Sequence, residues 1–156
     1  AAAITMGTYF KISETAIKEA IESYVSTNNR SQILTTKHNT IILDAYNANP
    51  SSMQVALENF DTLKAPSKVV ILGDMFELGK ESAYEHQAII DAATAFNFDE
   101  TYFIGENFNI AKTNKPQFKT YQAFEDFLKK NPLKNRSILI KGSRGMRLER
   151  ILEFIV

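Results

Sequence analysis

The chain has 156 residues, 18 Lys plus Arg against 18 Asp plus Glu, and no cysteine. This length suits one domain with its own hydrophobic core, and the balanced charge argues against nucleic acid or an anionic membrane as a partner. The lack of cysteine excludes disulfides and thiolate chemistry, and no apolar run approaches the roughly 20 residues of a membrane-spanning helix, so we expect a cytoplasmic protein without membrane insertion.

Residues 1–29 have helical character. Ala1–Phe10 has the composition of a buried helix end with nothing before it, so we expect the chain to be part of a longer protein. Ser13 is a suitable N-cap for an amphipathic helix that ends near the polar stretch 26–29. That stretch is the predicted boundary between residues 1–29 and a domain over 30–156.

From residue 31 the pattern alternates between strands and helices. Two strand-like runs, 31–37 and 40–45, flank the hairpin-like turn His38-Asn39. Further strands are expected at 68–72, 101–104, 118–121 and 137–140, and helices at about 50–63, 83–96, 107–112, 123–130 and from 145. This alternation predicts an α/β fold, a Rossmann-like three-layer αβα domain with a mostly parallel sheet, preceded by a short helical segment.

Three polar segments, 44–50, 72–79 and 141–149, each follow an apolar strand and precede a helix. The carboxyl ends of parallel strands meet at one edge of a sheet, where ligands of open α/β sheets bind. The sequence therefore predicts that these three segments converge on one binding or catalytic site.

In segment 44–50, Asp44 ends a strand, Asn49 can cap the next helix and Pro50 suits its first position. The free N–H groups of the helix terminus beside a carboxylate can hold a ribose hydroxyl, a metal-bound water or a substrate carboxylate. The alternative is that Asp44 and Asn47 only close a turn.

Segment 72–79 is not a phosphate-binding P-loop, because five residues separate Gly73 from Gly79 and Lys80 is followed by an acidic residue. Asp74 and Glu77 are placed to accept hydrogen bonds from a cation or an amine. The alternative is an ordinary acidic surface loop.

In segment 141–149, Ser143 and Arg144 follow a glycine turn, and Arg147 and Arg150 continue at a spacing of three on the expected helix. A basic helix edge beside free N–H groups is a credible site for a phosphate or a carboxylate. The alternative is a solvated face on which acidic neighbours pair with the arginines. No metal site is predicted, because neither of the two histidines has a second one at ligand spacing.

Together, Asp-Ala-Tyr-Asn-Ala-Asn-Pro from residue 44, Leu-Gly-Asp-Met-Phe-Glu-Leu-Gly from residue 72 and Lys-Gly-Ser-Arg-Gly-Met-Arg-Leu-Glu from residue 141 resemble the C-terminal domain of the Mur ligases. The resemblance runs from about Arg30 to the end of the chain, and residues 1–29 resemble the end of the family's central ATPase domain. Ala45 stands where the family usually has serine.

The resemblance implies an ATP-dependent acid–D-amino-acid ligase of peptidoglycan biosynthesis. The Tyr-Asn-Ala-Asn-Pro run points to members that add D-alanyl-D-alanine to UDP-N-acetylmuramoyl-tripeptide through an acyl phosphate. ATP and Mg²⁺ would be bound mainly by the central domain, which with the N-terminal domain is the implied partner within the protein. The isolated domain is expected to be inactive.

The resemblance also implies roles for individual residues. The ATP-binding residues would be Arg30, Asp44, Tyr46 and Asn47, with the ribose on Asp44 and the phosphates on Arg30. The substrate-binding residues would be Asn49, Asp74, Glu77, Ser143 and Arg144. Charge complementarity assigns the dipeptide carboxylate to Ser143 and Arg144 and its ammonium to the two acidic residues.

Two other function classes fit the same pattern. One is a stand-alone Rossmann-like module that binds a nucleotide or small anion without catalysis. The other is an interaction domain with a degenerate site. A P-loop upstream in the same reading frame would favour the ligase over both.

Overall fold

The computed structural model describes residues 1–24, 28–65 and 67–156. Helices α1 (Ala2–Tyr9) and α2 (Glu14–Glu22) form a helical pair, and the Ser13 hydroxyl caps α2 by accepting a hydrogen bond from the Ala16 N–H at 3.3 Å, as predicted. Most side chains of α1 are exposed, and Gly7 is its buried residue. Part of the predicted boundary stretch, Ser26 and Thr27, lies outside the described residues.

The remaining chain forms a six-stranded sheet in the order β1-β2-β6-β3-β4-β5. Its strands are β1 (Gln32–Thr35), β2 (Asn39–Asp44), β3 (Lys68–Gly73), β4 (Glu100–Ile104), β5 (Gln117–Phe118) and β6 (Arg136–Lys141). Strand β1 pairs antiparallel with β2 in the predicted hairpin, and all other neighbours pair in parallel. The predicted α/β class with a mostly parallel sheet is confirmed.

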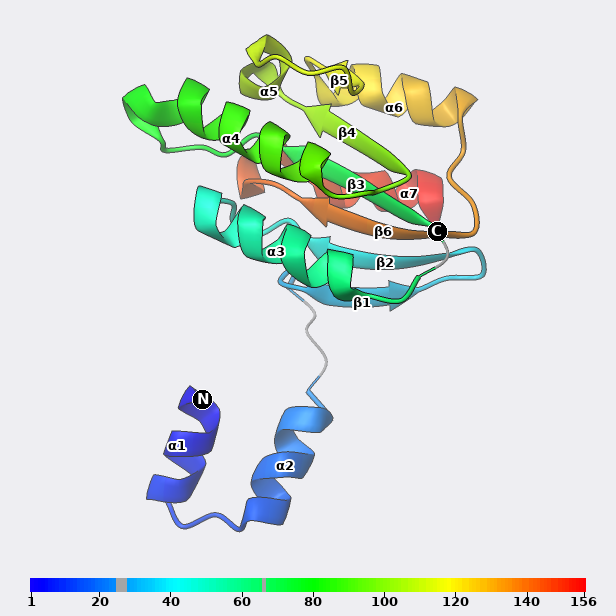
Figure 1. The fold of residues 1–156 in the computed structure, drawn as a ribbon. Coiled ribbons are helices and arrows are strands. Elements are labelled where there is room, and N and C mark those ends of the chain that lie inside the picture. Colours follow the sequence, from blue (N-terminus) through cyan, green and yellow to red (C-terminus); the bar gives the residue numbers. More distant parts are fainter. Residues whose placement is uncertain (25–27, 66) are drawn as a thin grey trace.

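Helices cover both faces of the sheet. They are α3 (Pro50–Thr62), α4 (Ser82–Ala95), α5 (Glu106–Ile110), α6 (Tyr121–Lys130) and α7 (Leu152–Ile155), with 3₁₀ turns at Gly79–Glu81, Arg144–Met146 and Leu148–Ile151. Figure 1 shows α3 and α4 on one face and α7 on the other. This is the three-layer arrangement that the alternation of strands and helices predicts.

Alternate side chains of β3 pack into two separate hydrophobic cores, one on each face of the sheet. Val69 and Ile71 pack with α6 and α7, whereas Val70 and Leu72 pack with α3, α4 and α5. Because side chains of a strand point to opposite faces in turn, a strand covered on both sides must be apolar throughout. This explains why the central strands read as continuous apolar runs.

The structure departs from the sequence-based expectation at β5 and near the end of the chain. Strand β5 ends at Phe118, and α6 begins at Tyr121, because the Thr120 hydroxyl caps the helix by accepting a hydrogen bond from the Ala123 N–H at 3.2 Å. The prediction of a single helix from residue 145 is wrong. This part of the chain is divided into two 3₁₀ turns and the short α7, because Arg147 adopts a left-handed φ of 52° between them.

Asn39 is the first residue of β2 rather than a turn residue, and it is buried. Its amide Nδ2 donates to the carbonyls of Leu133 and Ile155 at 3.0 and 2.7 Å, and its Oδ1 accepts from the Arg136 N–H at 3.0 Å. One side chain thus connects the start of β6 with the end of α7.

We expect Asn39→Ala to lower the free energy of unfolding by about 2–3 kcal/mol, because buried backbone partners are left without hydrogen bonds. Urea unfolding of the chain measures this loss. Asn109→Ala, at an exposed position of α5, is the matched control and should change the free energy by less than about 0.5 kcal/mol. Equal values for the two variants would contradict the role given to Asn39.

Candidate functional site

The structure brings the three polar segments together at one edge of the sheet. Strand β6 lies between β2 and β3, and Lys141 is in register with Asp44 on one side and Leu72 on the other. The chain after β2 forms α3 on one face, and the chain after β6 continues to the opposite face. Such a switch point is where open α/β sheets bind ligands.

The segment after β2 is held by its helix cap. Asn49 Oδ1 accepts from the Ser52 N–H at 2.8 Å, and Ser52 Oγ accepts from the Asn49 N–H at 3.1 Å, so the predicted cap is confirmed as a reciprocal capping box. Pro50 occupies the first turn, as predicted. The side-chain oxygen of Asn49 is therefore already committed to α3, and its role in substrate binding remains a prediction.

Two arginine side chains lie over the ring of Tyr46. The Cζ atom of Arg30 lies 3.8 Å from the ring centroid, and that of Arg144 lies 5.1 Å from it. Cations over an aromatic face are attracted by its quadrupole, so the ring gathers like charges that would otherwise repel each other. With the exposed Asn47 beside them, these side chains form a cationic, hydrogen-bonding surface at the sheet edge.

Asp44 is the last residue of β2, and both of its carboxylate oxygens have partners. Oδ1 accepts from the Ser31 N–H at 3.2 Å, and Oδ2 lies 2.5 Å from the Lys141 ammonium. The Lys141 ammonium also donates to the Asn47 carbonyl at 3.1 Å. The partly exposed Asp44 is thus charge-neutralised and held in a fixed orientation.

In the segment after β3, Asp74 is only 2% exposed. Its Oδ2 accepts from the backbone and side-chain amides of Asn107 at 2.9 and 3.0 Å, and its Oδ1 accepts from the Phe108 N–H at 2.9 Å. The carboxylate therefore caps α5. This geometry favours a positioning role for Asp74 over the predicted direct contact with a substrate ammonium.

His86 supports the same segment from α4 and is fully buried. Its Nε2 accepts a hydrogen bond from the Met75 N–H at 3.0 Å, so Nε2 carries no proton, and Nδ1 donates to the Ser82 carbonyl at 2.7 Å. Asp74 Oδ1 lies 3.6 Å from Nε2. Through these contacts the buried histidine holds the segment after β3 in place, which is a structural role.

Ser143 joins the second and third segments. Its N–H donates to the Asp74 carbonyl at 3.1 Å, and its Oγ accepts from the Phe76 N–H at 2.9 Å. This leaves the hydroxyl hydrogen available for a ligand. Close approach of the two segments needs glycine, since a Cβ on Gly142 would lie 3.1 Å from the Gly73 Cα.

The structure separates the three arginines that the sequence placed on one helix edge. Arg144 lies beside Tyr46, whereas Arg150 stacks on Tyr121 at 3.8 Å and donates to the Arg147 carbonyl at 3.0 Å. The left-handed Arg147 turns the chain between them. The predicted continuous basic edge is therefore wrong, and Arg144 alone of the three contacts Tyr46 within the described residues.

Glu77 lies at the tip of the second segment. It is exposed and has a left-handed φ of 66°. It is the acidic group of this segment that solvent reaches, because Asp74 is buried. That Glu77 meets a ligand ammonium stays a prediction, and its exposed side chain is accessible for that contact.

Lys141 is the residue that the motif analysis missed. A lysine as the last residue of a buried, apolar strand is a usable signal, because an ammonium inside a protein must be paired. Its partner could not be inferred from sequence, since only the strand order places β6 beside β2.

The donor set fits anions better than metal ions. No cluster of three or more His, Asp or Glu side chains suited to a metal occurs in the parts of the chain that the structure describes. No helix among these residues has the length and apolar character needed to cross a bilayer. The site combines two guanidinium groups, a hydroxyl and amides, which is the chemistry that recognises phosphates and carboxylates.

These features define a Rossmann-like α/β domain with a candidate anion-binding site at its switch point. A family model described as "Mur ligase, glutamate ligase domain" matches residues 29–144, and the chain belongs to the Mur ligase family. This membership confirms the family resemblance of the three motifs.

Curated relatives extend the match to almost the whole chain. The UDP-N-acetylmuramoyl-tripeptide–D-alanyl-D-alanine ligase of Borreliella burgdorferi is 34% identical over 158 residues, covering 96% of this chain and 34% of the relative. The ligase of the same name from Bacillus subtilis is 31% identical over 167 residues, covering 99% and 36%. The chain spans about a third of the length of the curated relatives it matches.

Solved structures share the fold. A MurF structure from Acinetobacter baumannii superposes with a TM-score of 0.80 at 24% identity, over 97% of this chain and 35% of that one. MurF from Thermotoga maritima in complex with ADP gives 0.78 at 22% identity, over 97% and 35%. A bifunctional folylpolyglutamate synthase/dihydrofolate synthase from Yersinia pestis gives 0.63 at 13% identity, over 91% and 34%.

Proposed function

We propose that this chain is the Mur ligase C-terminal domain of an ATP-dependent ligase that joins D-alanyl-D-alanine to UDP-N-acetylmuramoyl-tripeptide in peptidoglycan biosynthesis. The curated relatives with this name support the substrate pair. The observation that carries the proposal is the pair of arginines on the Tyr46 ring, because it concentrates positive charge where three strand ends meet. Carboxylates and phosphates are the groups this surface suits.

The reaction makes one amide bond at the expense of ATP. The terminal carboxylate of the tripeptide takes the γ-phosphoryl group of ATP to form an acyl phosphate, and ADP leaves. The amine of the dipeptide then attacks the acyl carbon, phosphate leaves, and the attacking nitrogen loses a proton. Catalysis of this kind depends on positioning and charge neutralisation.

The residues of this chain would position the dipeptide. Arg144 and the Ser143 hydroxyl would bind its carboxylate, and the exposed Glu77 would meet its amino end before reaction. Asn49 would line the junction with the nucleotide. Asp74 would act indirectly, by fixing the segment that carries Glu77.

ATP would be contacted from the same edge. Arg30 would meet the phosphates, Asp44 the ribose, and Tyr46 and Asn47 the space between nucleotide and dipeptide. Magnesium does not fit the described residues, because Asp44 is committed to Lys141 and Ser31. The ligands of Mg²⁺ would therefore come from the central domain of the whole protein.

The proposal is tested by identifying which amine substrate the full-length protein joins to the tripeptide. Incubation with ATP, Mg²⁺, UDP-N-acetylmuramoyl-tripeptide and either D-alanyl-D-alanine or glutamate should give a product only with the dipeptide, detected by mass spectrometry. The 156-residue chain alone should give no product and release no phosphate. Product formation with glutamate but not with the dipeptide would overturn the proposed substrate.

A further inference from the structure

Lys141 combines features that the proposed roles leave unexplained. It is 1% exposed, yet it carries an ammonium group at the end of the central strand β6. Taking a charge out of water costs several kcal/mol even after relaxation, and an apolar side chain would fill the space at lower cost. A charged residue here needs a reason beyond packing.

The contacts of Lys141 supply that reason. Its Nζ lies 2.5 Å from Asp44 Oδ2 and 3.1 Å from the Asn47 carbonyl, so one ammonium holds the end of β2 and the turn that follows it. That turn carries the half-buried Tyr46 and the exposed Asn47. Tyr46 in turn contacts Arg144 from the segment after β6.

These contacts form a closed loop that begins at the last residue of β6 and ends in the segment after β6. Lys141 fixes the turn, the turn carries Tyr46, the Tyr46 ring contacts Arg144, and Arg144 lies three residues beyond Lys141. Displacement of the turn would move the ring, and with it the cation that rests on the ring. A displacement of about 1 Å can cost roughly 100-fold in rate when groups must be aligned.

We propose that Lys141 is a positioning residue, which sets the Asp44 carboxylate and the Tyr46 turn in the geometry that the ligands require. The inference rests on the proposed function, because the affected ligands are the nucleotide and the dipeptide. It also makes a claim independent of activity. Without the ammonium, the backbone amides of residues 45–48 should exchange their hydrogens faster.

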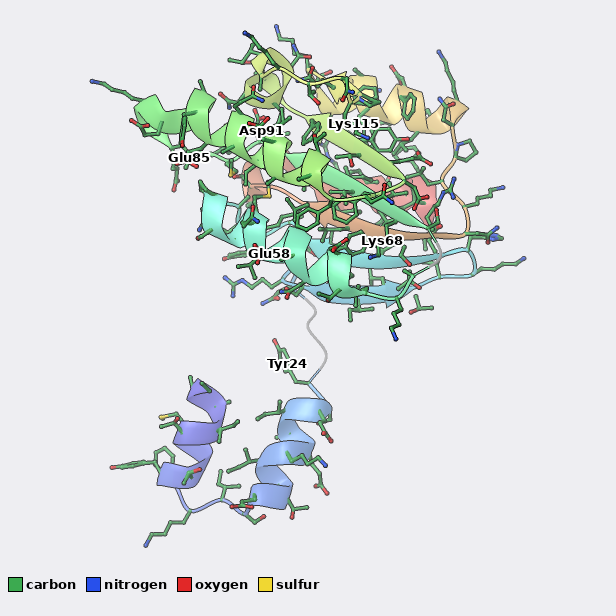
Figure 2. All side chains as sticks on the ribbon, in the orientation of Figure 1. Tyr24, Glu58, Lys68, Glu85, Asp91 and Lys115 are labelled. Carbon is green, nitrogen blue, oxygen red and sulfur yellow. The ribbon has the colours of Figure 1, made fainter. Side chains whose placement is uncertain are left out.

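The test uses Lys141→Met in the full-length protein, with Lys68→Met as the matched control. Lys68 is the first residue of β3, at the opposite end of the sheet, and is labelled in Figure 2. It forms a similar contact there, because its Nζ donates to the Asp61 carbonyl at 2.5 Å. Loss of either lysine removes one ion pair, but only Lys141 lies at the candidate site.

For Lys141→Met we expect the KM for ATP or for D-alanyl-D-alanine to rise about 10- to 100-fold, whereas Lys68→Met should stay within about twofold of the wild type. Exchange of amides 45–48 should be at least about tenfold faster only in Lys141→Met. A merely structural role would lower the active fraction, and hence the apparent kcat, without raising either KM. Unchanged KM values in Lys141→Met would overturn the inference, and so would unchanged exchange of amides 45–48.

Asp44→Asn completes a double-mutant cycle. If Lys141 acts through Asp44, the double variant should raise the KM for ATP no more than about threefold beyond the stronger single variant, because both changes remove the same contact. Multiplied effects would contradict action through Asp44. If Lys141→Met does not fold, Lys141→Gln, which retains a hydrogen-bond donor, provides the same measurements.

The two proposals fail in different ways. A wild-type protein without dipeptide-dependent phosphate release would overturn the proposed ligase, whatever Lys141 does to the exchange of residues 45–48. An active wild type whose KM values are insensitive to Lys141→Met would overturn only the positioning role.

Discussion

Arg144→Ala in the full-length protein should raise the KM for D-alanyl-D-alanine about 10- to 100-fold, because a charge-assisted, two-pronged contact with the dipeptide carboxylate is lost. The KM for UDP-N-acetylmuramoyl-tripeptide should change by less than about threefold, since Arg144 is assigned to the other substrate. Steady-state phosphate release at varied concentrations of each substrate measures both values.

Two further variants sharpen this prediction. Arg144→Lys keeps the charge but loses the planar fork, so its KM for the dipeptide should lie between those of the wild type and Arg144→Ala. Arg147→Asn is the control, because this exposed arginine is left-handed and asparagine tolerates that conformation. Its kinetics should match the wild type. An unchanged dipeptide KM in Arg144→Ala would reject the assignment.

Gly105→Ala should lower the free energy of unfolding by about 3 kcal/mol or more, because it combines backbone strain with a steric clash. Gly105 has a φ of 128°, and a Cβ there would lie 2.2 Å from the Asp74 Cγ. Either the carboxylate gives up its cap on α5 or β4 shifts. Urea unfolding of the chain measures the loss.

Gly79→Ala is the comparison in which a positive φ is present without a steric clash. Gly79 also has a positive φ, 56°, but nothing lies within 4 Å of its would-be Cβ. Its substitution should cost about 1 kcal/mol from backbone strain alone. If both variants lose the same free energy, the close packing of Gly105 against Asp74 contributes nothing to stability.

Much of the fold could be predicted because local patterns determine it. The apolar runs of β3 and β6 indicated buried parallel strands, and Ser13 and Asn49 marked helix starts that the structure confirms. The convergence of three strand ends followed from the alternation of strands and helices. These features depend on residues close together in sequence.

The contacts within the site could not be predicted, because they depend on strand order. Lys141 and Asp44 are 97 positions apart in the sequence. They are in contact because β6 lies between β2 and β3 in the sheet. Asp74 is acidic and lies in a loop, which suggested a ligand contact, yet α5 lies close enough to take both of its oxygens.

The prediction that Arg144, Arg147 and Arg150 share one helix edge is wrong for a different reason. A spacing of three predicts a shared face only on a continuous helix. The left-handed Arg147 breaks that continuity, and neither spacing nor composition revealed it.

The most direct test of the ligase proposal is phosphate release by the full-length protein with ATP, Mg²⁺, UDP-N-acetylmuramoyl-tripeptide and D-alanyl-D-alanine, each omitted in turn. Release at its full rate should require all four components, because the acyl phosphate forms only with the tripeptide and turns over only with the dipeptide. Release that continues at the same rate without the dipeptide, or no release from a folded, complete protein, would contradict the account.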